Sequence, residues 1–225
     1  MALHLIILGP PGAGKGTQAE RFARERGIPK ISTGDILREA ASAGTETGLR
    51  AQAIMARGEL VSDDVIIEIV RERLQRPDAL GGFVLDGFPR TVAQAAALDA
   101  TVDRHDPLIV VDIAVPEVEL MRRLGSRMVC QDCGANADLA VAECRLCGGR
   151  LVQRADDNNG VVRERLKVYH RQSEPLVEYY RVRPTFRSID GARPPDLVAA
   201  DLAAAVESVG HLSRVATVRP SGAEG

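Results

Sequence analysis

The sequence lacks several features typical of membrane, secreted or nucleic-acid-binding proteins. The formal net charge is −2, so the chain supplies no polycationic field for nucleic acid. No window approaches the ~20 apolar residues that span a bilayer. The apolar run at 3–8 has no basic lead and no small-residue cleavage site, which favours a strand over a signal segment. We therefore expect a cytoplasmic protein with neither duplex DNA nor a membrane as its partner.

Lysine and cysteine are scarce, and their positions are informative. The three lysines are Lys15, Lys30 and Lys167, and the first stands in a glycine-rich loop at the position that phosphate-binding loops give to lysine. All four cysteines fall between 130 and 147. In a reducing compartment such clustering indicates a metal rather than disulfides.

Strand and helix patterns alternate along a chain of 225 residues, which is long enough for one buried α/β core. Strands are predicted at 3–8, 28–31, 82–85, 107–115 and 186–190. Helices are predicted at 15–26, 36–43, 47–57, 62–76, after 91, at 117–128, from 160 with a break at Pro175, and from 195. The predicted fold is an α/β doubly wound parallel sheet with a core of 1–31, 62–126 and 159–215, insertions at 32–61 and 127–158, and a disordered tail at 216–225.

The loop after the first strand, residues 9–17, reads Gly-Pro-Pro-Gly-Ala-Gly-Lys-Gly-Thr. Backbone N–H groups of such a loop converge on phosphate oxygens at a helix N-terminus, and Lys15 adds a positive charge. Gly16 departs from the strict pattern, which has Ser or Thr directly after the lysine. A glycine-rich turn without a ligand is the alternative, but the preceding strand and following helix favour a nucleoside triphosphate site.

Asp86 and several arginines are the candidates for handling the phosphates. Asp86 ends a predicted strand, where a carboxylate can hold Mg²⁺, although a surface Asp-Gly turn is the alternative. Guanidinium groups match phosphate oxygens, although most arginines in so arginine-rich a chain are surface groups. The candidates are Arg38, Arg90, Arg123, Arg127, Arg154 and Arg165. The spacing of Arg123 and Arg127 predicts that both lie on one helix face, as like charges that need an anion between them.

Two C-x-x-C pairs, Cys130 with Cys133 and Cys144 with Cys147, are separated by ten residues. This pattern predicts a tetrahedral site of four thiolates suited to Zn²⁺. Four thiolates leave no open coordination position, so the metal would be structural. Four thiols without a metal, or two disulfides, are the alternatives.

In this order the motifs resemble the adenylate kinase family, in the long bacterial form whose lid binds zinc. The matching strings are GPPGAGKGT at 9–17, ISTGDILR at 31–38, GFVLDGFPRT at 82–91, QRADD at 153–157 and VRERLKVYH at 162–170. With the cysteines, the resemblance covers about residues 1–210. It implies a P-loop nucleoside monophosphate kinase that acts as a monomer. Its substrates would be ATP, AMP and ADP, and its cofactors Mg²⁺ and a structural Zn²⁺.

The resemblance also implies a role for individual residues. The ATP site would comprise Gly12, Ala13, Gly14, Lys15, Gly16, Thr17, Arg123, Arg127, Asn136, Ala137 and Arg193. The AMP site would comprise Thr33, Arg38, Glu59, Leu60, Val61, Gly87, Phe88, Pro89, Arg90, Gln94, Arg154 and Arg165. The catalytic set would be Lys15, Asp86, Arg90, Arg127, Arg154 and Arg165. No general base is needed, because a nucleotide phosphate with a second pKa near ~6 is already mostly dianionic at neutral pH.

Some positions depart from the family pattern or have a second interpretation. The ten-residue spacer between the cysteine pairs is shorter than usual, and Asn136 and Ala137 stand where the family usually has a hydroxyl and an aromatic residue. Gln94 and Thr91 also form a capping box, so Gln94 serves both roles only if its carbonyl caps the helix and its amide faces the base.

Three alternatives remain beside an adenylate kinase. A UMP/CMP kinase shares the sheet and loop but generally lacks a long lid. A nucleic-acid-binding zinc ribbon on an NTPase would need stacking residues, whereas 127–150 contains no aromatic residue. An inactive scaffold is disfavoured because every residue of the candidate catalytic set is present.

Overall fold

The computed structural model describes residues 2–102, 107–125, 127–132, 136–138, 141–153 and 159–216. Its centre is a five-stranded parallel sheet in the order β2-β3-β1-β4-β8. These strands are β1 (Leu3–Leu8), β2 (Lys30–Ser32), β3 (Gly82–Asp86), β4 (Leu108–Ala114) and β8 (Phe186–Asp190). The doubly wound parallel sheet predicted from the sequence is confirmed.

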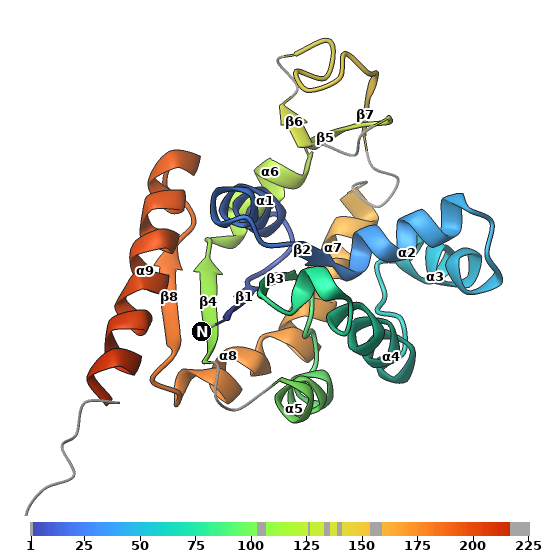
Figure 1. Ribbon diagram of the computed structural model, residues 1–225. Helices are drawn as coiled ribbons and strands as arrows, with labels where there is room; N and C mark the ends of the chain where they lie inside the picture. Colours follow the sequence, from blue (N-terminus) through green and yellow to red (C-terminus); the bar gives the residue numbers. More distant parts are fainter. Residues whose placement is uncertain are drawn as a thin grey trace, which may run out of the picture.

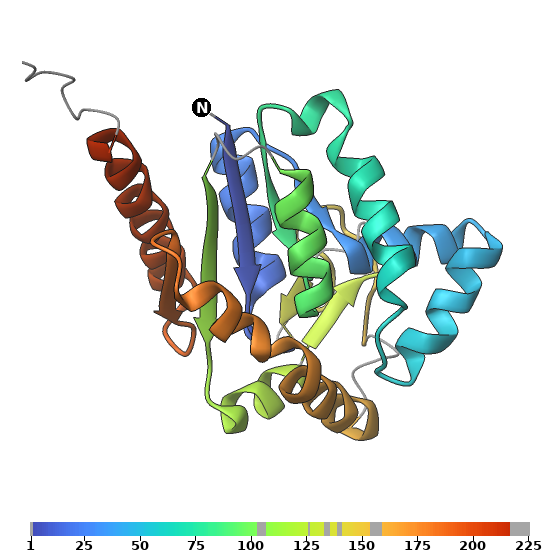
Figure 2. The same ribbon diagram turned by 90° about the horizontal axis from the view of Figure 1, so that it is seen from below.

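Helices cover both faces of this central sheet (Figures 1 and 2). One face packs against α1 (Lys15–Arg26), α6 (Glu117–Gly125), α7 (Asn159–Val168) and α9 (Pro195–Ala216). The other face packs against α4 (Asp63–Leu74), α5 (Val92–Thr101) and α8 (Pro175–Arg181), with α2 (Thr33–Ser42) and α3 (Glu46–Ala56) extending from it. Two short turns complete the helical elements, a 3₁₀ turn at Pro77–Ala79 and a π turn at Tyr169–Ser173.

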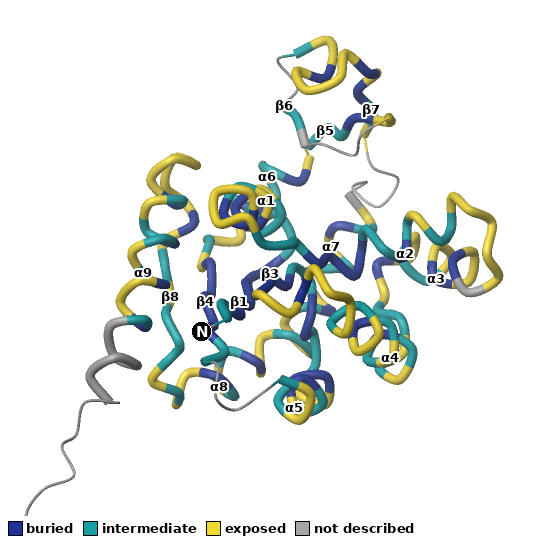
Figure 3. Tube along the Cα trace, in the orientation of Figure 1, coloured by how far each residue is buried: buried dark blue, intermediate teal, exposed yellow. Residues whose placement is uncertain are grey.

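The continuous apolar run of β1 is explained by burial on both faces. Leu5 and Ile7 belong to one hydrophobic cluster, and Ile6 and Leu8 belong to the other. Figure 3 shows most of β1, β3 and β4 as buried, whereas β8 is intermediate or exposed. A half-exposed strand would alternate apolar and polar residues, whereas a strand covered by helices on both sides has no polar face.

All five strands of the central sheet run in the same direction, so their carboxyl ends meet at one edge. Ile7 of β1 pairs with Asp86 of β3, and Leu8 pairs with Asp112 of β4. The glycine loop, the Asp86–Arg90 segment and α2 all leave the sheet at this edge. Open α/β sheets bind ligands at this edge, so the topology brings the sequence motifs together.

Two smaller parts project from the core, as Figure 1 shows. One is the hairpin of α2 and α3, where Gly48 lies against the backbone of Ala40 so closely that a Cβ would be 2.2 Å from its carbonyl carbon. The other is an antiparallel sheet in the order β6-β5-β7, here called the lid sheet. Its strands are β5 (Arg127–Cys130), β6 (Asn136–Asp138) and β7 (Leu151–Gln153).

The predicted helix over 117–128 is wrong at its end. Helix α6 stops at Gly125, and Arg127 opens β5. The reason is pairing along both edges of β5, since Arg127 is in register with Asp138, and Met128 with Gln153. Arg123 and Arg127 therefore do not share a helix face, and the argument from their four-residue spacing fails.

Most other boundaries agree with the sequence prediction within a few residues. Strand β8 and the start of α9 agree, and the break at Pro175 takes the form of the π turn before α8. Cys133, Arg154 and the predicted tail beyond Ala216 lie outside the described residues. In the described part of the chain, no helix combines the length and the apolar character needed to cross a membrane.

Candidate active site

The glycine loop turns the chain from β1 directly into α1. Gly9, Gly12 and Gly14 have φ angles of 136°, 84° and 91°, which favour glycine. A Cβ at Gly9 would lie 2.6 Å from the Ile113 carbonyl oxygen, and one at Gly12 would lie 2.9 Å from Leu124 Cγ. The loop therefore packs tightly on β4 and α6 at the start of α1, where backbone N–H groups attract anions.

Lys15 is the first residue of α1, and its side chain folds back over the loop. Its Nζ donates hydrogen bonds to the carbonyl oxygens of Gly9 at 2.8 Å and Pro10 at 2.9 Å. Burial lowers the pKa of Lys15 to about 8, and the positive charge of Arg90 adds to this effect while Asp86 opposes it. The Lys15 ammonium group therefore lies beside the backbone N–H groups of the loop.

Asp86 lies beside Gly16, the residue that follows Lys15. A Cβ at Gly16 would lie 3.2 Å from Asp86 Oδ2, so a larger residue would require the carboxylate to shift slightly. The same carboxylate lies close enough to Lys15 to affect its pKa. Asp86 at the end of β3 is thus next to both Lys15 and Gly16 at the start of α1.

Across the edge of the sheet, the turn after β3 forms a second polar cluster. The carbonyl oxygen of Gly87 accepts hydrogen bonds from Thr33 Oγ1 at 3.0 Å and from Arg90 Nε at 2.8 Å. Gly87 has a φ of 76°, and a Cβ there would lie 2.9 Å from Arg90 Nη2. The turn therefore needs glycine in order to hold the Arg90 guanidinium beside it.

A chain of charges continues from this cluster along the cleft. Arg38 donates a hydrogen bond to Asp35, and Lys30 Nζ lies 3.4 Å from Asp35 Oδ2 and 2.9 Å from Glu20 Oε2. Burial alone would raise the pKa of Asp35, but the hydrogen bond and charge of Arg38 outweigh it and lower the pKa. Lys30 and Asp35 were missed by sequence reasoning, although the scarcity of lysine could have drawn attention to Lys30.

The segment between α3 and α4 lies against α7. A Cβ at Gly58, where φ is 78°, would lie 3.1 Å from Arg165 Cγ. Glu59 pairs with Arg57 at 2.9 Å, and both side chains are exposed. The contact at Gly58 places Arg165 next to the segment between α3 and α4.

Gln94 is 1% exposed and lies in a polar network of its own. Thr91 caps α5 by accepting a hydrogen bond from the Gln94 N–H at 3.2 Å. The Gln94 Oε1 accepts from the N–H of Arg90 at 2.7 Å, one residue before the position that a capping box uses. Its amide nitrogen donates to Asp63 Oδ1 at 2.7 Å.

One cleft of about 630 Å³ collects most of these residues. The predicted site residues that line it are Gly12, Ala13, Gly14, Lys15, Gly16, Thr17, Arg38, Glu59, Leu60, Asp86, Gly87, Pro89, Arg90, Arg123, Arg127, Ala137, Arg165 and Arg193. Thr33, Val61, Phe88 and Gln94 are not part of its lining, and the side chain of Asn136 lies outside the described part of the structure. Arg123 and Arg127 thus reach the same cleft from α6 and β5.

Arg123 and Arg193 have carboxylate partners, as do Arg38 and Arg122 in the same cleft. Arg123 Nε lies 2.7 Å from Glu119 Oε1, and Arg193 pairs with Asp201. Hydrogen bonds from Arg122 and Arg123 lower the pKa of Glu119 to about 2. These pairs hold arginine side chains at the cleft, where the oxygens of a bound polyphosphate could replace the carboxylates as their partners.

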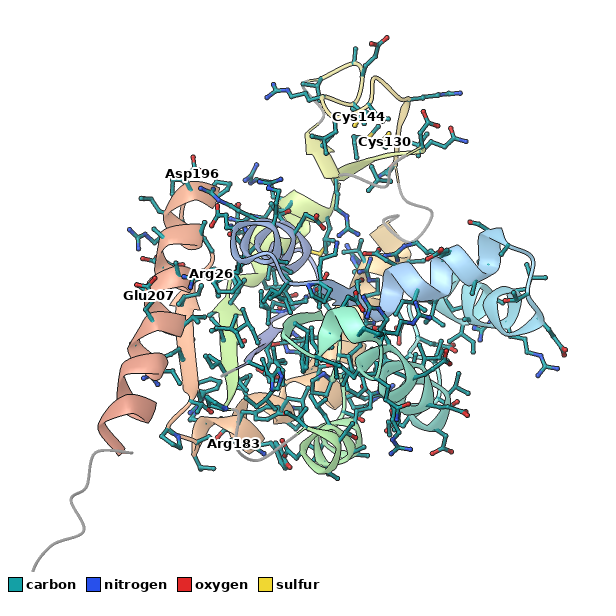
Figure 4. All side chains as sticks on the ribbon, in the orientation of Figure 1. Arg26, Cys130, Cys144, Arg183, Asp196 and Glu207 are labelled. Carbon is teal, nitrogen blue, oxygen red and sulfur yellow. The ribbon has the colours of Figure 1, made fainter. Side chains whose placement is uncertain are left out.

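The three cysteines that the structure describes come together beside the lid sheet. The sulfur atoms of Cys130, Cys144 and Cys147 lie within 4.8 Å of one another, and Figure 4 shows Cys130 and Cys144 at the lid sheet. Cys130 Sγ and Cys147 Sγ are 3.4 Å apart, much farther than the ~2.05 Å of a disulfide. Zn–S bonds of ~2.3 Å place tetrahedral sulfurs about 3.8 Å apart, so the cluster fits a thiolate-bound metal.

The chain turns tightly around this cluster. The N–H of Cys144 donates to the Gly149 carbonyl at 2.9 Å, and the N–H of Gly148 donates to the Cys144 carbonyl at 2.8 Å. A Cβ at Gly149 would lie 2.8 Å from Cys130 Sγ. Gly149 is therefore required for the second cysteine pair to approach the first.

Comparison with known proteins connects this geometry to one family. The sequence model of the family described as adenylate kinase matches residues 7–185. A curated adenylate kinase from Archaeoglobus fulgidus is 48% identical over 215 residues, which cover 92% of this chain and 99% of that protein. Adenylate kinases from Methanocella arvoryzae and Desulforudis audaxviator are 45% and 46% identical, over 92% and 91% of this chain and 100% and 99% of their own lengths.

Proposed function

Because the chain belongs to the adenylate kinase family of nucleoside monophosphate kinases, we propose that it transfers the γ-phosphoryl group of ATP to AMP, giving two ADP. The observation that carries this proposal is the single cleft lined by Lys15, Asp86, Arg90, Arg127 and Arg165. Such a cleft supplies positive charge from several directions, which is what in-line phosphoryl transfer requires.

The two ends of the cleft would hold different nucleotides. The loop at 12–17 would bind the ATP phosphates, with Arg123, Arg127 and Arg193 on the same side. The turn at 87–90, Thr33, Arg38, the 59–61 segment and Gln94 would form the AMP side. Arg154 and Arg165 would meet the phosphates between them. The AMP phosphate is already mostly dianionic at neutral pH, so the protein needs to align and neutralise rather than remove a proton.

Two metals fit the residues present. Asp86, next to Gly16 and Lys15, would hold Mg²⁺ directly or through its waters, and the ion would neutralise charge on the ATP phosphates. Cys130, Cys144 and Cys147, with Cys133, would hold a structural Zn²⁺. Carboxylate oxygen suits the first ion and thiolate sulfur suits the second.

The chain would divide into a core of 1–31, 62–126 and 159–215, an AMP-binding insertion at 32–61 and a lid at 127–158. The last two would close over the cleft and exclude water. We further propose that the protein acts as a monomer in the cytoplasm, where cysteines remain available to a metal, with ATP, AMP and ADP as its partners and no nucleic acid or membrane.

The test is AMP-dependent formation of ADP from ATP in a coupled assay, repeated for Arg90→Ala. We expect that variant to fold and to lose about 10²-fold or more in kcat/KM. Arg26→Ala is the matched control, because Arg26 lies on the outer side of α1 and pairs with Glu207 on α9 (Figure 4). An equal loss in both variants, or none in either, would contradict the proposal.

Two further assays decide between the alternatives. CMP, UMP and GMP replace AMP in the same coupled assay, and faster turnover with CMP or UMP would indicate the pyrimidine enzyme. ATP hydrolysis that nucleic acid stimulates, without any response to AMP, would indicate a nucleic-acid-dependent NTPase. With an adenylate kinase, AMP gives the highest kcat/KM and nucleic acid has no effect.

A further inference from the structure

Asp63, the first residue of α4, makes a bridge between two distant parts of the chain. Its Oδ2 accepts a hydrogen bond from Thr91 Oγ1 at 2.8 Å, and its Oδ1 accepts from Gln94 Nε2 at 2.7 Å. Both donors belong to the start of α5, which lies beside α4 in Figure 1. Both carboxylate oxygens are thus used by neutral donors.

The neighbouring residue shows that this bridge is not needed for the helix itself. Asp63 and Asp64 both lie in the first turn of α4, where a carboxylate stabilises the positive end of the helix dipole. Asp64 is exposed and serves that purpose equally well from the surface. Asp63 differs from it in reaching across to α5, so its contacts call for a second explanation.

The bridge fixes the orientation of the Gln94 amide. An ionised carboxylate only accepts hydrogen bonds, so the nitrogen of Gln94 must face Asp63. Its oxygen then faces the N–H of Arg90, from which it accepts at 2.7 Å. The Arg90 side chain in turn donates to the Gly87 carbonyl at 2.8 Å. A continuous series of hydrogen bonds therefore links Asp63 to the guanidinium of Arg90.

Asp63 is also joined covalently to the other wall of the acceptor side, because the 59–61 segment runs directly into α4. We propose that Asp63 is a positioning residue for the acceptor nucleotide, which holds the 59–61 segment and the 87–90 turn in register through Thr91 and Gln94. This inference rests on the proposed function, which assigns those two segments to AMP.

The proposed role of Asp63 should affect the binding of AMP and not that of ATP. The glycine loop rests on β4 and α6, whereas the hydrogen bonds described for the Asp63 carboxylate go to Thr91 and Gln94 at the start of α5. Loss of the bridge frees Gln94 and with it the backbone of Arg90, so the acceptor phosphate is held less well. ATP binding at the glycine loop should be almost unaffected.

The experiment compares Asp63→Ala with Asp64→Ala in the coupled assay. Both variants remove one carboxylate from the same helix turn, so the dipole effect is matched. We expect Asp63→Ala to raise the KM for AMP about tenfold and the KM for ATP by less than about twofold. Asp64→Ala should leave both values unchanged. An equal rise in both KM values for Asp63→Ala, or no rise in either, overturns the inference.

A second pair of variants tests the coupling even if Asp63→Ala folds poorly. Gln94→Glu sets a second carboxylate against Asp63, and adding Asp63→Asn supplies an amide donor to that carboxylate. The double variant should exceed Gln94→Glu alone in kcat/KM for AMP by about fivefold. No gain overturns the inference. If the unmodified protein itself forms no ADP from ATP and AMP, it is the proposed function that fails.

Discussion

The central sheet lies between two large clusters of buried side chains, whereas the lid sheet has a cluster of three buried residues, Cys130, Cys144 and Leu151, among those the structure describes. Burial of apolar area stabilises a segment in proportion to its core, and a small segment needs another source of stability. In the lid sheet the cysteine cluster lies where a core would otherwise be. The central sheet is therefore stabilised by packing, whereas the proposed metal would stabilise the lid sheet by ligation.

The same contrast divides the candidate site. Lys15 is partly buried, is held by two loop carbonyls and lies in a loop that packs on the core. Arg127 enters the cleft from the lid sheet, so its position depends on the cysteine cluster. One part of the site is thus fixed by the core, and the other part follows the lid sheet.

Metal removal should have the largest effect, because structural zinc sites contribute about 10–16 kcal/mol of binding free energy that is also folding free energy. With a chelator or with Cys144→Ser, we expect the lid sheet to unfold and the central sheet to persist. Activity should fall about 10²-fold because Arg127 loses its position. Hydrogen exchange of 127–132 compared with 3–8 measures both regions.

Leu146→Ser is the matched control for this experiment, since Leu146 lies between two of the cysteines and is 77% exposed. It should change neither protection nor activity. Protection of β5 that survives chelation would show that the lid sheet is stabilised by packing, and the contrast between the two sheets would fail.

Replacing one buried leucine in each sheet by alanine should show how differently packing stabilises the two sheets. Leu85 of β3 is fully buried in a large cluster, so Leu85→Ala should lower the free energy of unfolding by about 3 kcal/mol. Leu151→Ala should weaken the lid sheet locally and leave the main thermal transition unchanged. Circular dichroism during heating measures this transition, and equal shifts in the two variants would contradict the expectation.

How far the sequence predicted the structure also differs between the two sheets. Strands β1 and β8 were predicted with the bounds that the structure shows, and the signal for β1 was local, an apolar run ended by Gly-Pro. In the lid, the first two residues of β5 were assigned to the end of the helix predicted over 117–128. The pairing of Arg127 with Asp138 and of Met128 with Gln153 is non-local, and no local pattern reveals it.

The candidate site shows the same limit. Glycine and lysine at 9–17 predicted the loop because its backbone geometry demands those residues. The bond between Asp63 and Gln94 spans 31 positions of the chain, and no spacing rule links the two residues. The orientation of the Gln94 amide was therefore beyond sequence reasoning, whereas the capping role of Thr91 was within it.

The smallest expected effect concerns the protonation of Lys15. The pKa of Lys15 is lowered to about 8 by burial, so in the free protein Lys15 loses its proton as the pH rises above that value. ATP phosphates favour the charged form and raise this pKa on binding. Below pH ~7 binding should take up no proton at Lys15, whereas near pH ~8.5 it should take up a fraction of one proton, and affinity should fall as the pH rises further.

Calorimetric titration with ATP at both pH values, in buffers of different ionisation enthalpy, measures this proton uptake. Lys15→Met should abolish it. Lys30→Met is the matched control, because Lys30 lines the same cleft but its pKa is raised. Burial, the largest single cause, would lower that pKa, but the hydrogen bond to Glu20 and the negative charges of Asp35, Glu20 and Asp86 together outweigh it. Proton uptake should therefore persist in Lys30→Met. Proton uptake that persists in Lys15→Met would show that another group takes up the proton. The protonation of Lys15 would then no longer be a difference between the part of the site fixed by the core and the part that follows the lid sheet.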